Sequence, residues 1–303
     1  MPGNRVWPAP LRAGDRVALV APAGPAPVVE LEAGTAVLEG WGLRVEPAFP
    51  PGEVHPRLRY LAADDAARAK QLQQAWCDPD IAAVICARGG YGALRMLDLV
   101  DWDAMAAAPS KIFAGSSDIT ALHAVLGRSC DVVTLFAPLT ATGAMLDPDT
   151  QEHLRRALFD PPDVLHGAAQ AETIIGGRAT GRLVGGTLSL VVSTLGVPDV
   201  ELPPDGAIVL LEDITERPYR IDQFLTHLLR AGWFDRVSGI VLGSWHKCGE
   251  PAEVHDVIVD RLGPLGVPLV EEFGFGHCPD ARTMPLGAVA ELDATARTLT
   301  IRR

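Results

Sequence analysis

The amino-acid sequence predicts an α/β protein whose first half is a mostly parallel sheet covered by helices on both faces. Short apolar runs without polar alternation occur at residues 16–22, 81–87, 111–115 and 132–138. Such runs are typical of strands buried on both faces. Two helical segments, residues 28–42 and 63–80, lie among these runs, the first closing at Gly42 and the second beginning with acidic residues. Strands that alternate with helices form parallel sheets, which bind ligands outside their carboxyl ends.

The second half of the chain predicts a further α/β domain. Apolar runs at residues 206–213 and 238–245 are expected as buried strands, separated by an amphipathic helix that ends at Gly232. Residues 176–196 are expected as glycine turns followed by an apolar helix, and residues 288–303 as two strands joined by a turn. Pro, Asp and Gly accumulate between the two halves. We therefore expect domains at residues 1–160 and 176–303, joined by a linker at residues 161–175.

Composition limits the class of protein. The net charge of −12 and the pI near 5.1 argue against nucleic acid or an anionic membrane as a partner. The five cysteines form no CxxC pair, which favours reduced thiols in a cytoplasm over a disulfide framework. The first residues lack the apolar region of a signal peptide, and no apolar stretch reaches the roughly 18 residues of a membrane span. The sequence thus predicts a cytoplasmic protein.

One sharp corner carries candidate chemistry. The apolar run ending at Gly115 is followed directly by Ser116, Ser117 and Asp118, and then by an amphipathic helix. A strand, tight turn and helix would expose Ser117 at the carboxyl edge of the sheet, as in a nucleophile elbow, although Ile119 breaks the G-x-S-x-G consensus. A serine before an apolar helix is more often an N-cap. The segment alone favours the cap, and Ser116 is the rival hydroxyl.

A glycine-rich turn follows the apolar run at residues 81–87. It reads Arg88-Gly89-Gly90-Tyr91-Gly92 and leads into a helix. It matches neither phosphate-binding glycine motif, so the simplest interpretation is a sterically tight turn. Beside an exposed nucleophile, the same backbone amides could form half of an oxyanion hole.

Two residues of the second half could complete a catalytic site. Glu212 ends an apolar strand, where a salt bridge with Arg217 or Arg220 is an equally good explanation. His277 lies in a loop rich in glycine and proline, and imidazole is the commonest general base near neutral pH. The chain order Ser, Glu, His is one that hydrolytic triads adopt.

A zinc site is the competing interpretation of the histidines and cysteines. His246, Cys248, His277 and Cys278 are ligand types for Zn²⁺, but their spacing fits no zinc motif and adjacent residues tend to diverge. The pattern argues against a metal.

Six segments together resemble the L,D-carboxypeptidases of the serine-peptidase type, also called muramoyltetrapeptide carboxypeptidases. They are "LVAPAGP" (19–25), "RLRYLAADDAARAKQLQQAWCDPDIAAVICARGGYG" (57–92), "FAGSSDITALH" (113–123), "GRLVGGTLSLVVSTLG" (181–196), "LLEDITERPYRIDQFLTHL" (210–228) and "GFGHCPDARTMPLG" (274–287). Their order and spacing are more specific than any one segment, and they favour the nucleophile over the cap.

The resemblance implies a role for each candidate residue. Ser117 would be the nucleophile, His277 the general base and Glu212 the residue that orients the imidazole, with backbone amides of Gly90 and Asp118 as the oxyanion hole. It also implies a smaller C-terminal α/β domain, an active site in the cleft between the domains, a homodimer and no cofactor. The chain departs from the family at Ser116, at Gln223 and at residues 136–138, which could reshape the substrate pocket.

The reaction implied by the resemblance removes the terminal D-Ala from a murein tetrapeptide during peptidoglycan recycling in the cytoplasm. A related self-immunity peptidase that cleaves a peptide–nucleotide antibiotic of the microcin C type is the nearest alternative. The compact stretch between Pro218 and His277 leaves little room for a substrate-covering loop, which favours the cell-wall peptide. A noncatalytic module that binds nucleotides or muropeptides is a more distant alternative.

Overall fold

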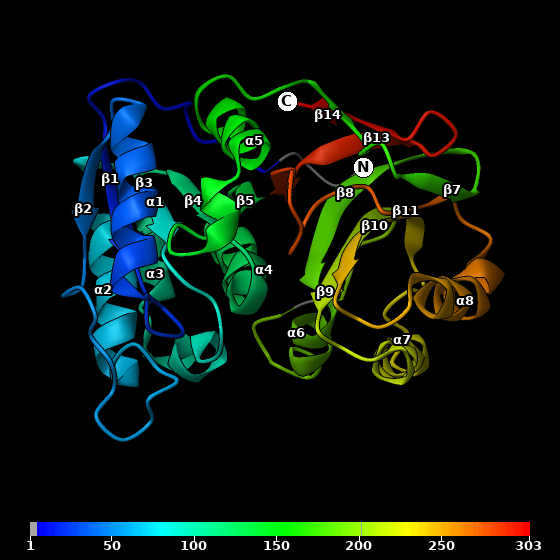
Figure 1. Ribbon diagram of the computed structural model, residues 1–303, viewed down its shortest axis with the longest axis horizontal. Helices are drawn as coiled ribbons and strands as arrows, with labels where there is room; N and C mark the ends of the chain where they lie inside the picture. Colours follow the sequence, from blue (N-terminus) through cyan, green and yellow to red (C-terminus); the bar gives the residue numbers. More distant parts are fainter. Residues whose placement is uncertain (1–4, 201) are drawn as a thin grey trace. The chain divides into compact units, whose positions relative to one another are not determined.

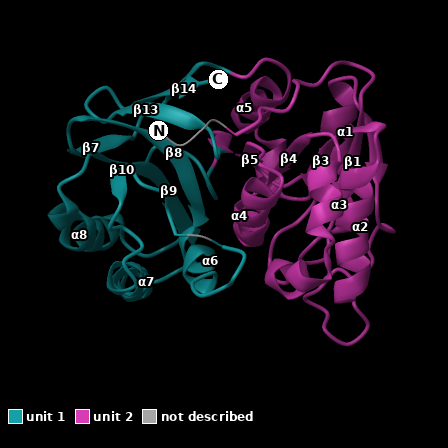
Figure 2. Ribbon diagram, turned by 180° about the vertical axis from the view of Figure 1, so that it is seen from behind, with its two compact units in different colours: residues 1–4, 162–278, 286–303 teal, residues 5–161, 279–285 magenta. Residues whose placement is uncertain are grey.

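Residues 5–200 and 202–303 are described by a computed structural model, in which the chain forms two compact units (Figure 2). Unit 2 comprises residues 5–161 together with residues 279–285. Unit 1 holds residues 162–278 and 286–303. A short segment from near the end of the chain, residues 279–285, is therefore part of the unit that the first half of the chain forms.

The sheet of unit 2 has six strands in the order β12-β5-β4-β3-β1-β2 (Figure 1). The strands are β1 (Arg16–Val20), β2 (Arg44–Pro47), β3 (Ile81–Cys86), β4 (Ile112–Gly115), β5 (Thr134–Phe136) and β12 (Met284–Leu286). Strands β1 to β5 pair in parallel, which confirms the predicted fold class for the first half. Most of their residues are buried because helices cover both faces of such a sheet.

Helices of unit 2 pack on the apolar strands. The α-helices are α1 (Val28–Gly40), α2 (Asp65–Cys77), α3 (Trp102–Ala107), α4 (Thr120–Ser129) and α5 (Pro148–Phe159), and the short 3₁₀ helices are η1 (Ala93–Leu99), η2 (Ser117–Ile119) and η3 (Gly143–Leu146). One face of the sheet forms a core with Leu31 and Leu38 of α1 and Leu154 of α5. Helix α2 begins where Asp64 accepts a hydrogen bond from the Ala67 amide, as the acidic start of this segment predicts.

Unit 1 contains a mixed sheet of eight strands in the order β6-β14-β13-β8-β9-β10-β11-β7. They are β6 (Val164–His166), β7 (Glu172–Ile175), β8 (Arg178–Thr187), β9 (Ala207–Ile214), β10 (Val237–His246), β11 (Leu269–Glu271), β13 (Val289–Asp293) and β14 (Thr298–Arg302). Strands β8 to β11 run parallel, and the remaining pairings are antiparallel. The predicted strands at residues 206–213 and 238–245 and the predicted C-terminal strand pair are confirmed.

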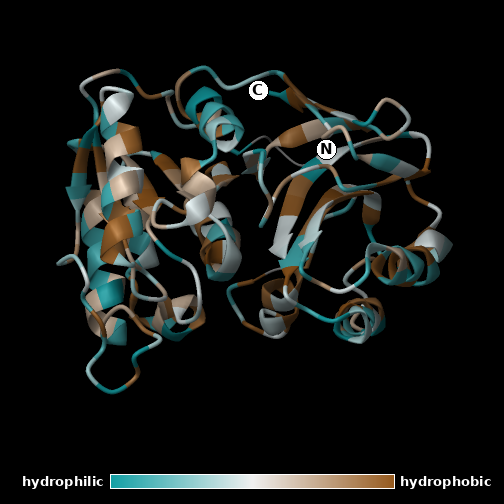
Figure 3. Cartoon of the chain, in the orientation of Figure 1, coloured by the Kyte–Doolittle hydropathy of each residue, from teal (hydrophilic) through white to brown (hydrophobic). Residues whose placement is uncertain are grey.

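Three helices cover the parallel part of this sheet. They are α6 (Leu188–Ser193), α7 (Pro218–Arg230) and α8 (Pro251–Leu262), and η4 (Gly263–Leu265) follows α8. The apolar face of α7, with Ile221, Leu225 and Leu228, is buried against β9 and β10. Figure 3 shows α7 divided between hydrophobic and hydrophilic residues, as the amphipathic pattern predicts.

The expected apolar helix within residues 176–196 is present as α6, but the expectation of glycine turns is wrong for Gly181, Gly185 and Gly186. Residues 178–187 form the long strand β8 instead. A β-carbon at Gly181 would lie 1.8 Å from the Gly206 carbonyl oxygen, and one at Gly185 would lie 2.0 Å from that of Leu210. These glycines are thus required by the close approach of β9 rather than by turns.

Residues 161–175, expected as a linker, contain β6 and β7, which pair with β14 and β11. Their Pro, Asp and Gly content reflects short strands separated by turns. None of the helices in the described part of the chain combines the length and hydropathy that crossing a bilayer requires.

Candidate active site

Ser117 lies at the turn that follows β4, which we call the nucleophile turn (residues 116–118). Its φ of 61° is left-handed, a conformation that costs a non-glycine residue about 1–2 kcal/mol. Within residues 111–120 it is the one residue that is not buried. Ser116 is extended, with φ of −148°, and only 7% exposed. Of the two serines in this turn, only Ser117 is thus appreciably accessible to solvent.

Neither serine hydroxyl caps a helix. Ser116 precedes η2 without a side-chain capping bond, and Ile119 is the residue that precedes α4. The helix-cap interpretation of this corner is therefore wrong. A strained serine that caps nothing is typical of a nucleophile elbow.

The glycine loop, residues 89–92, lies against the nucleophile turn. A β-carbon at Gly89 would lie 2.8 Å from Ser117 Cβ and 3.1 Å from its Oγ, so only glycine fits here. Gly90 is exposed and has φ of 100°, which glycine adopts without strain. The Gly89 carbonyl accepts a hydrogen bond from the Gly24 amide at 2.8 Å. The sequence-predicted loop and serine are thus neighbours within unit 2.

A buried histidine supports the nucleophile turn from the sheet side. His123 Nε2 lies 2.9 Å from the Gly115 carbonyl oxygen, and Nδ1 lies 2.9 Å from the Thr134 hydroxyl. Burial lowers the pKa of His123 to about 4. The ring is therefore neutral near pH 7, donates from Nε2 to the carbonyl and accepts from Thr134. His123 does not face the solvent as a catalytic base would.

Glu212 and His277 form a hydrogen-bonded pair within unit 1. His277 Nδ1 lies 2.8 Å from Glu212 Oε2, and the His277 backbone amide donates to the same oxygen at 3.1 Å. The other oxygen, Oε1, accepts from the Thr187 hydroxyl at 2.5 Å. The carboxylate is completely buried, so its orientation is set by these hydrogen bonds rather than by solvent. The bond to Nδ1 in turn orients the imidazole.

Local packing explains why the chain brings these two residues together. Thr187 ends β8 directly opposite Glu212 of β9. The buried rings of Phe273 and Phe275 anchor the segment that leads to His277, and the Phe275 carbonyl accepts from the Ser244 amide. A β-carbon at Gly276 would lie 2.3 Å from a Glu212 oxygen, so glycine is required beside the carboxylate.

The electrostatics of the pair favour a base. Burial opposes protonation of His277, but the charge and hydrogen bond of Glu212 outweigh it, and the pKa of His277 is raised. Nδ1 faces Glu212, which leaves Nε2 as the nitrogen that can accept a proton. Burial, together with the nearby Glu212 charge, raises the pKa of Asp213 to about 6.

Glu212 does not form the strand-end salt bridge that was the alternative interpretation of this residue. Arg220 pairs with Glu216 at 3.5 Å and stacks over the ring of Phe224. Asp213 accepts hydrogen bonds from the amides of Ser189 and Ile214. A salt bridge with an arginine is thus the wrong interpretation of Glu212, and the neighbouring carboxylate is occupied by backbone amides.

Metal-ligating side chains do not gather in the described part of the chain. Residues 5–200 and 202–303 contain no group of three or more His, Cys, Asp or Glu residues placed to hold a metal ion. Cys248, one of the zinc candidates, is buried in the core formed by α7, α8 and the adjoining strands.

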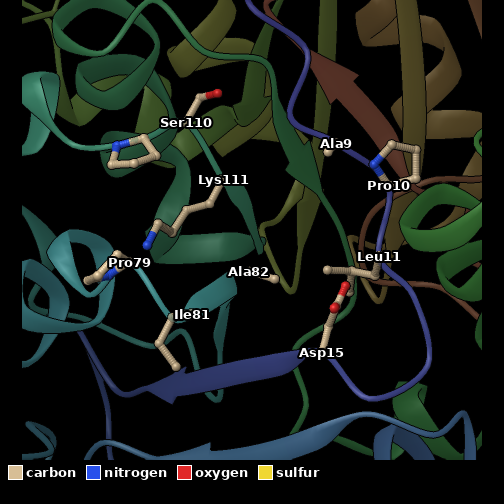
Figure 4. Close-up of a pocket in the computed structure, with 10 residues that line it drawn as sticks. Ala9, Pro10, Leu11, Asp15, Pro79, Ile81, Ala82, Ser110 and Lys111 are labelled. Carbon is tan, nitrogen blue, oxygen red and sulfur yellow. The ribbon is translucent and has the colours of Figure 1, made fainter.

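Unit 2 also contains a cavity of about 220 Å³, whose lining residues are drawn in Figure 4. It is lined by Asp15, Ile81 and Lys111, which lie at the amino-terminal ends of β1, β3 and β4. Lys111 donates to the Asp78 carbonyl at 2.6 Å. Ser117 follows the carboxyl end of β4, so this cavity does not contain the candidate nucleophile.

Three side chains that support the candidate active site could not be identified from the sequence. Thr187, His123 and the carboxylate of Asp118 act through neighbours that are distant in the chain. For His123, an unaccompanied histidine on an otherwise apolar helix was the available signal.

Comparisons with known proteins identify similar proteins along nearly the whole chain. Residues 17–137 match the LD-carboxypeptidase N-terminal domain, and residues 180–292 match the LD-carboxypeptidase C-terminal domain. A Streptomyces coelicolor protein with a provisional carboxypeptidase designation is 48% identical over 98% of this chain and 96% of its own. The murein tetrapeptide carboxypeptidase of Pseudomonas aeruginosa is 32% identical over 92% of this chain and 93% of its own.

Solved structures share the fold. The muramoyltetrapeptide carboxypeptidase of Oxalobacter formigenes has a TM-score of 0.80 and 26% identity, covering 95% of this chain and 99% of its own. The microcin C7 self-immunity protein has a TM-score of 0.87 and 21% identity, with 98% of both chains covered, a likeness of fold alone. The two domain matches and the extent of the relatives identify this chain as a member of the LD-carboxypeptidase family.

Proposed function

We propose that this protein is a serine L,D-carboxypeptidase that hydrolyses the terminal D-Ala from murein tetrapeptides. The observation that carries the proposal is the partly exposed, left-handed Ser117 packed against a glycine loop. The name of the Pseudomonas aeruginosa relative supports the substrate class. The proposal needs no metal or cofactor, since serine, imidazole and backbone amides supply the chemistry of amide hydrolysis.

The proposed mechanism uses one residue for each chemical task. Ser117 Oγ attacks the carbonyl carbon of the bond before D-Ala, and His277 Nε2 takes the hydroxyl proton. The backbone amides of Gly90 and Asp118 stabilise the resulting oxyanion. His277 then gives the proton to the leaving amine of D-Ala, which departs and leaves an acyl-enzyme.

Deacylation follows the same logic. A water molecule gives a proton to His277 and attacks the ester, and the proton returns to Ser117 as the tripeptide leaves. Throughout both steps, Glu212 holds Nδ1 protonated and stabilises the imidazolium that forms. The mechanism requires Ser117 of unit 2 and the Glu212–His277 pair of unit 1 to act on one substrate.

The test is mass spectrometry of products from muropeptides with three, four and five residues. We expect the purified protein to shorten only the tetrapeptide, by one alanine. Ser117→Ala should abolish this activity, whereas Ser116→Ala should retain most of it, because Ser116 is buried and its hydroxyl is not presented. An untouched tetrapeptide would refute the function, and loss confined to Ser116→Ala would refute the nucleophile.

A peptide–nucleotide antibiotic belongs in the same assay. Between Pro218 and His277, the chain is occupied by α7, β10, α8, η4 and β11 with short connections, which supports the smaller cell-wall substrate. Faster cleavage of an aminoacyl sulfamoyl nucleoside than of tetrapeptide would favour self-immunity instead. Binding of either compound without hydrolysis would favour a noncatalytic module.

We also propose that the enzyme works as a homodimer in the cytoplasm during peptidoglycan recycling. Family resemblance supports the dimer, and five free cysteines support a reducing compartment. Sedimentation equilibrium of the purified protein and fractionation of cells that produce it test these two statements separately.

A further inference from the structure

The side chain of Asp118 has partners of its own in unit 2. It is 2% exposed, and its Oδ2 accepts a hydrogen bond from the Ala93 amide at 2.7 Å. The Gly92 amide also stabilises the ionised carboxylate, and the charge of Arg68 adds to this. The carboxylate thus bonds backbone at the end of the glycine loop, whereas the backbone of the same residue belongs to the nucleophile turn.

The rest of the glycine loop is also held by hydrogen bonds. The Gly92 carbonyl accepts from the buried guanidinium of Arg68 at 2.9 Å. Arg68 is itself fixed by the Ala63 carbonyl, the Pro22 carbonyl and an ion pair with Asp65. Gly24 holds the other end of the loop through the Gly89 carbonyl.

One amide of the loop is left unengaged by this arrangement. Among the residues that the structure describes, the Gly90 N–H makes no hydrogen bond, whereas the Gly89 carbonyl before it and the Ala93 amide after it both do. Gly90 is also exposed. An oxyanion hole needs donors that are fixed in place before the reaction and free to bond the developing charge.

We propose that the Asp118 carboxylate is a positioning residue that ties the glycine loop to the nucleophile turn and so fixes the two oxyanion donors. Because the amides of Gly90 and Asp118 belong to different loops, their separation depends on what connects those loops. The Asp118 side chain is a short, buried connection of this kind. The inference rests on the proposed serine mechanism and adds a role for a side chain that this mechanism does not itself use.

The test compares Asp118→Ala and Asp118→Asn with the parent protein on tetrapeptide. Loss of one oxyanion donor lowers kcat by about 10²–10³. We expect Asp118→Ala to lose about this factor, with KM changed less than about threefold, since the donors act mainly in the transition state. Asp118→Asn keeps one acceptor oxygen but loses the charge, so it should recover about tenfold of the lost kcat and remain about 10- to 10²-fold below the parent.

Asp101→Ala is the matched control. Asp101 accepts the Ala104 amide at 2.9 Å at the start of α3, so it makes the same type of bond in the same unit away from Ser117. This variant should melt at a lower temperature with unchanged kcat. If Asp118→Ala fails to fold, Asp118→Asn is compared with the parent alone.

The outcomes separate the two proposals. Activity in Ser117→Ala would refute the serine mechanism itself. If Ser117→Ala is inactive, wild-type kcat in a folded Asp118→Ala or in Asp118→Asn would overturn the positioning role. A loss of kcat in Asp118→Ala no larger than that in Asp101→Ala would also overturn it. A kcat loss in Asp118→Ala with partial recovery in Asp118→Asn would support it.

Discussion

Two of the three candidate catalytic side chains, those of Glu212 and His277, are held by hydrogen bonds that limit their freedom. Glu212 has no exposed surface, and both of its oxygens accept hydrogen bonds. His277 is held at its backbone and at its ring by the same carboxylate oxygen. Such an arrangement fixes the tautomer and the orientation of the imidazole before a substrate arrives.

Glu212→Gln should lower kcat by about two to three orders of magnitude. In serine proteases with a Ser-His-Asp triad, the corresponding acid-to-amide change costs about 10⁴ because the imidazole adopts the wrong tautomer. Here the amide nitrogen can face Thr187, whose hydroxyl can accept, so the amide oxygen stays with His277. The loss should therefore reflect the missing charge beside the imidazolium.

Steady-state kinetics on tetrapeptide and a thermal melt of the same preparation measure this effect. KM should change little, because the charge acts mainly in the transition state. Near-normal turnover with an unchanged melt would remove Glu212 from the mechanism.

At the scale of elements, neighbouring parallel strands bring the chemistry to one sheet edge in each unit. In unit 2, β3 and β4 pair directly, so the glycine loop after β3 meets the nucleophile turn after β4. In unit 1, β8 pairs with β9, which places Thr187 opposite Glu212. Close packing at these edges leaves no space for extra side-chain atoms.

Gly89→Ala should abolish most of the peptidase activity. The new β-carbon would lie 2.8 Å from Ser117 Cβ and 3.3 Å from a methyl group of Leu139. Because Ser117 Cβ is attached directly to the backbone, the nucleophile turn or the glycine loop must move. We expect kcat to fall at least about 10²-fold, as for a lost oxyanion donor.

Gly40→Ala is the control for this substitution. Gly40 ends α1, and a β-carbon there would meet nothing within 4 Å. It should leave kcat unchanged and raise stability slightly, since alanine favours helix over glycine. Equal kcat values for the two variants would contradict the steric argument.

These elements differ in how far the sequence could predict them. Strands β1, β3, β4, β9 and β10 follow from apolar runs, because burial on both faces leaves a local pattern. Strand β8 does not, because its glycines are required by the close approach of the backbone at Gly206 and Leu210, which are distant in the chain. The partners of Glu212, His123 and Asp118 were unpredictable for the same reason, whereas Ser117 and His277 stood in recognisable motifs.

At the scale of the whole molecule, buried ionisable groups couple stability to pH in opposite directions. Burial lowers the pKa of His123 to about 4 and raises that of Asp118 and of Asp213 to about 6. As pH falls from 6 to 4, the two aspartates take up protons more readily in the folded state and stabilise it. His123 has the opposite effect, because only the unfolded chain binds its proton in this range.

His123→Gln should isolate the histidine contribution. Below pH 6.5 the unfolded parent chain gains a proton that the folded protein refuses until about pH 4, which costs up to about 1.4 kcal/mol per pH unit. The variant cannot titrate, although its amide can still donate to the Gly115 carbonyl. It should be less stable than the parent at pH 8, and this deficit should shrink as pH falls toward 4.

Urea unfolding at half-unit pH steps from 8 to about 4 gives the free energies of unfolding for both proteins. A deficit that stays constant across this range would show that His123 titrates alike in the folded and unfolded chains.

The way unit 2 completes its sheet has a consequence for biosynthesis. Strand β12, next to β5 in the sheet, comes from residues 284–286, whereas β5 ends at Phe136. A growing chain on the ribosome therefore makes five strands of this sheet early and then makes nearly all of unit 1 before the sixth emerges. Until then the outer edge of β5 has unpaired backbone groups, which can pair with another nascent chain. Translation that stops after residue 161, before unit 1 is made, should leave an aggregation-prone fragment rather than a free-standing domain.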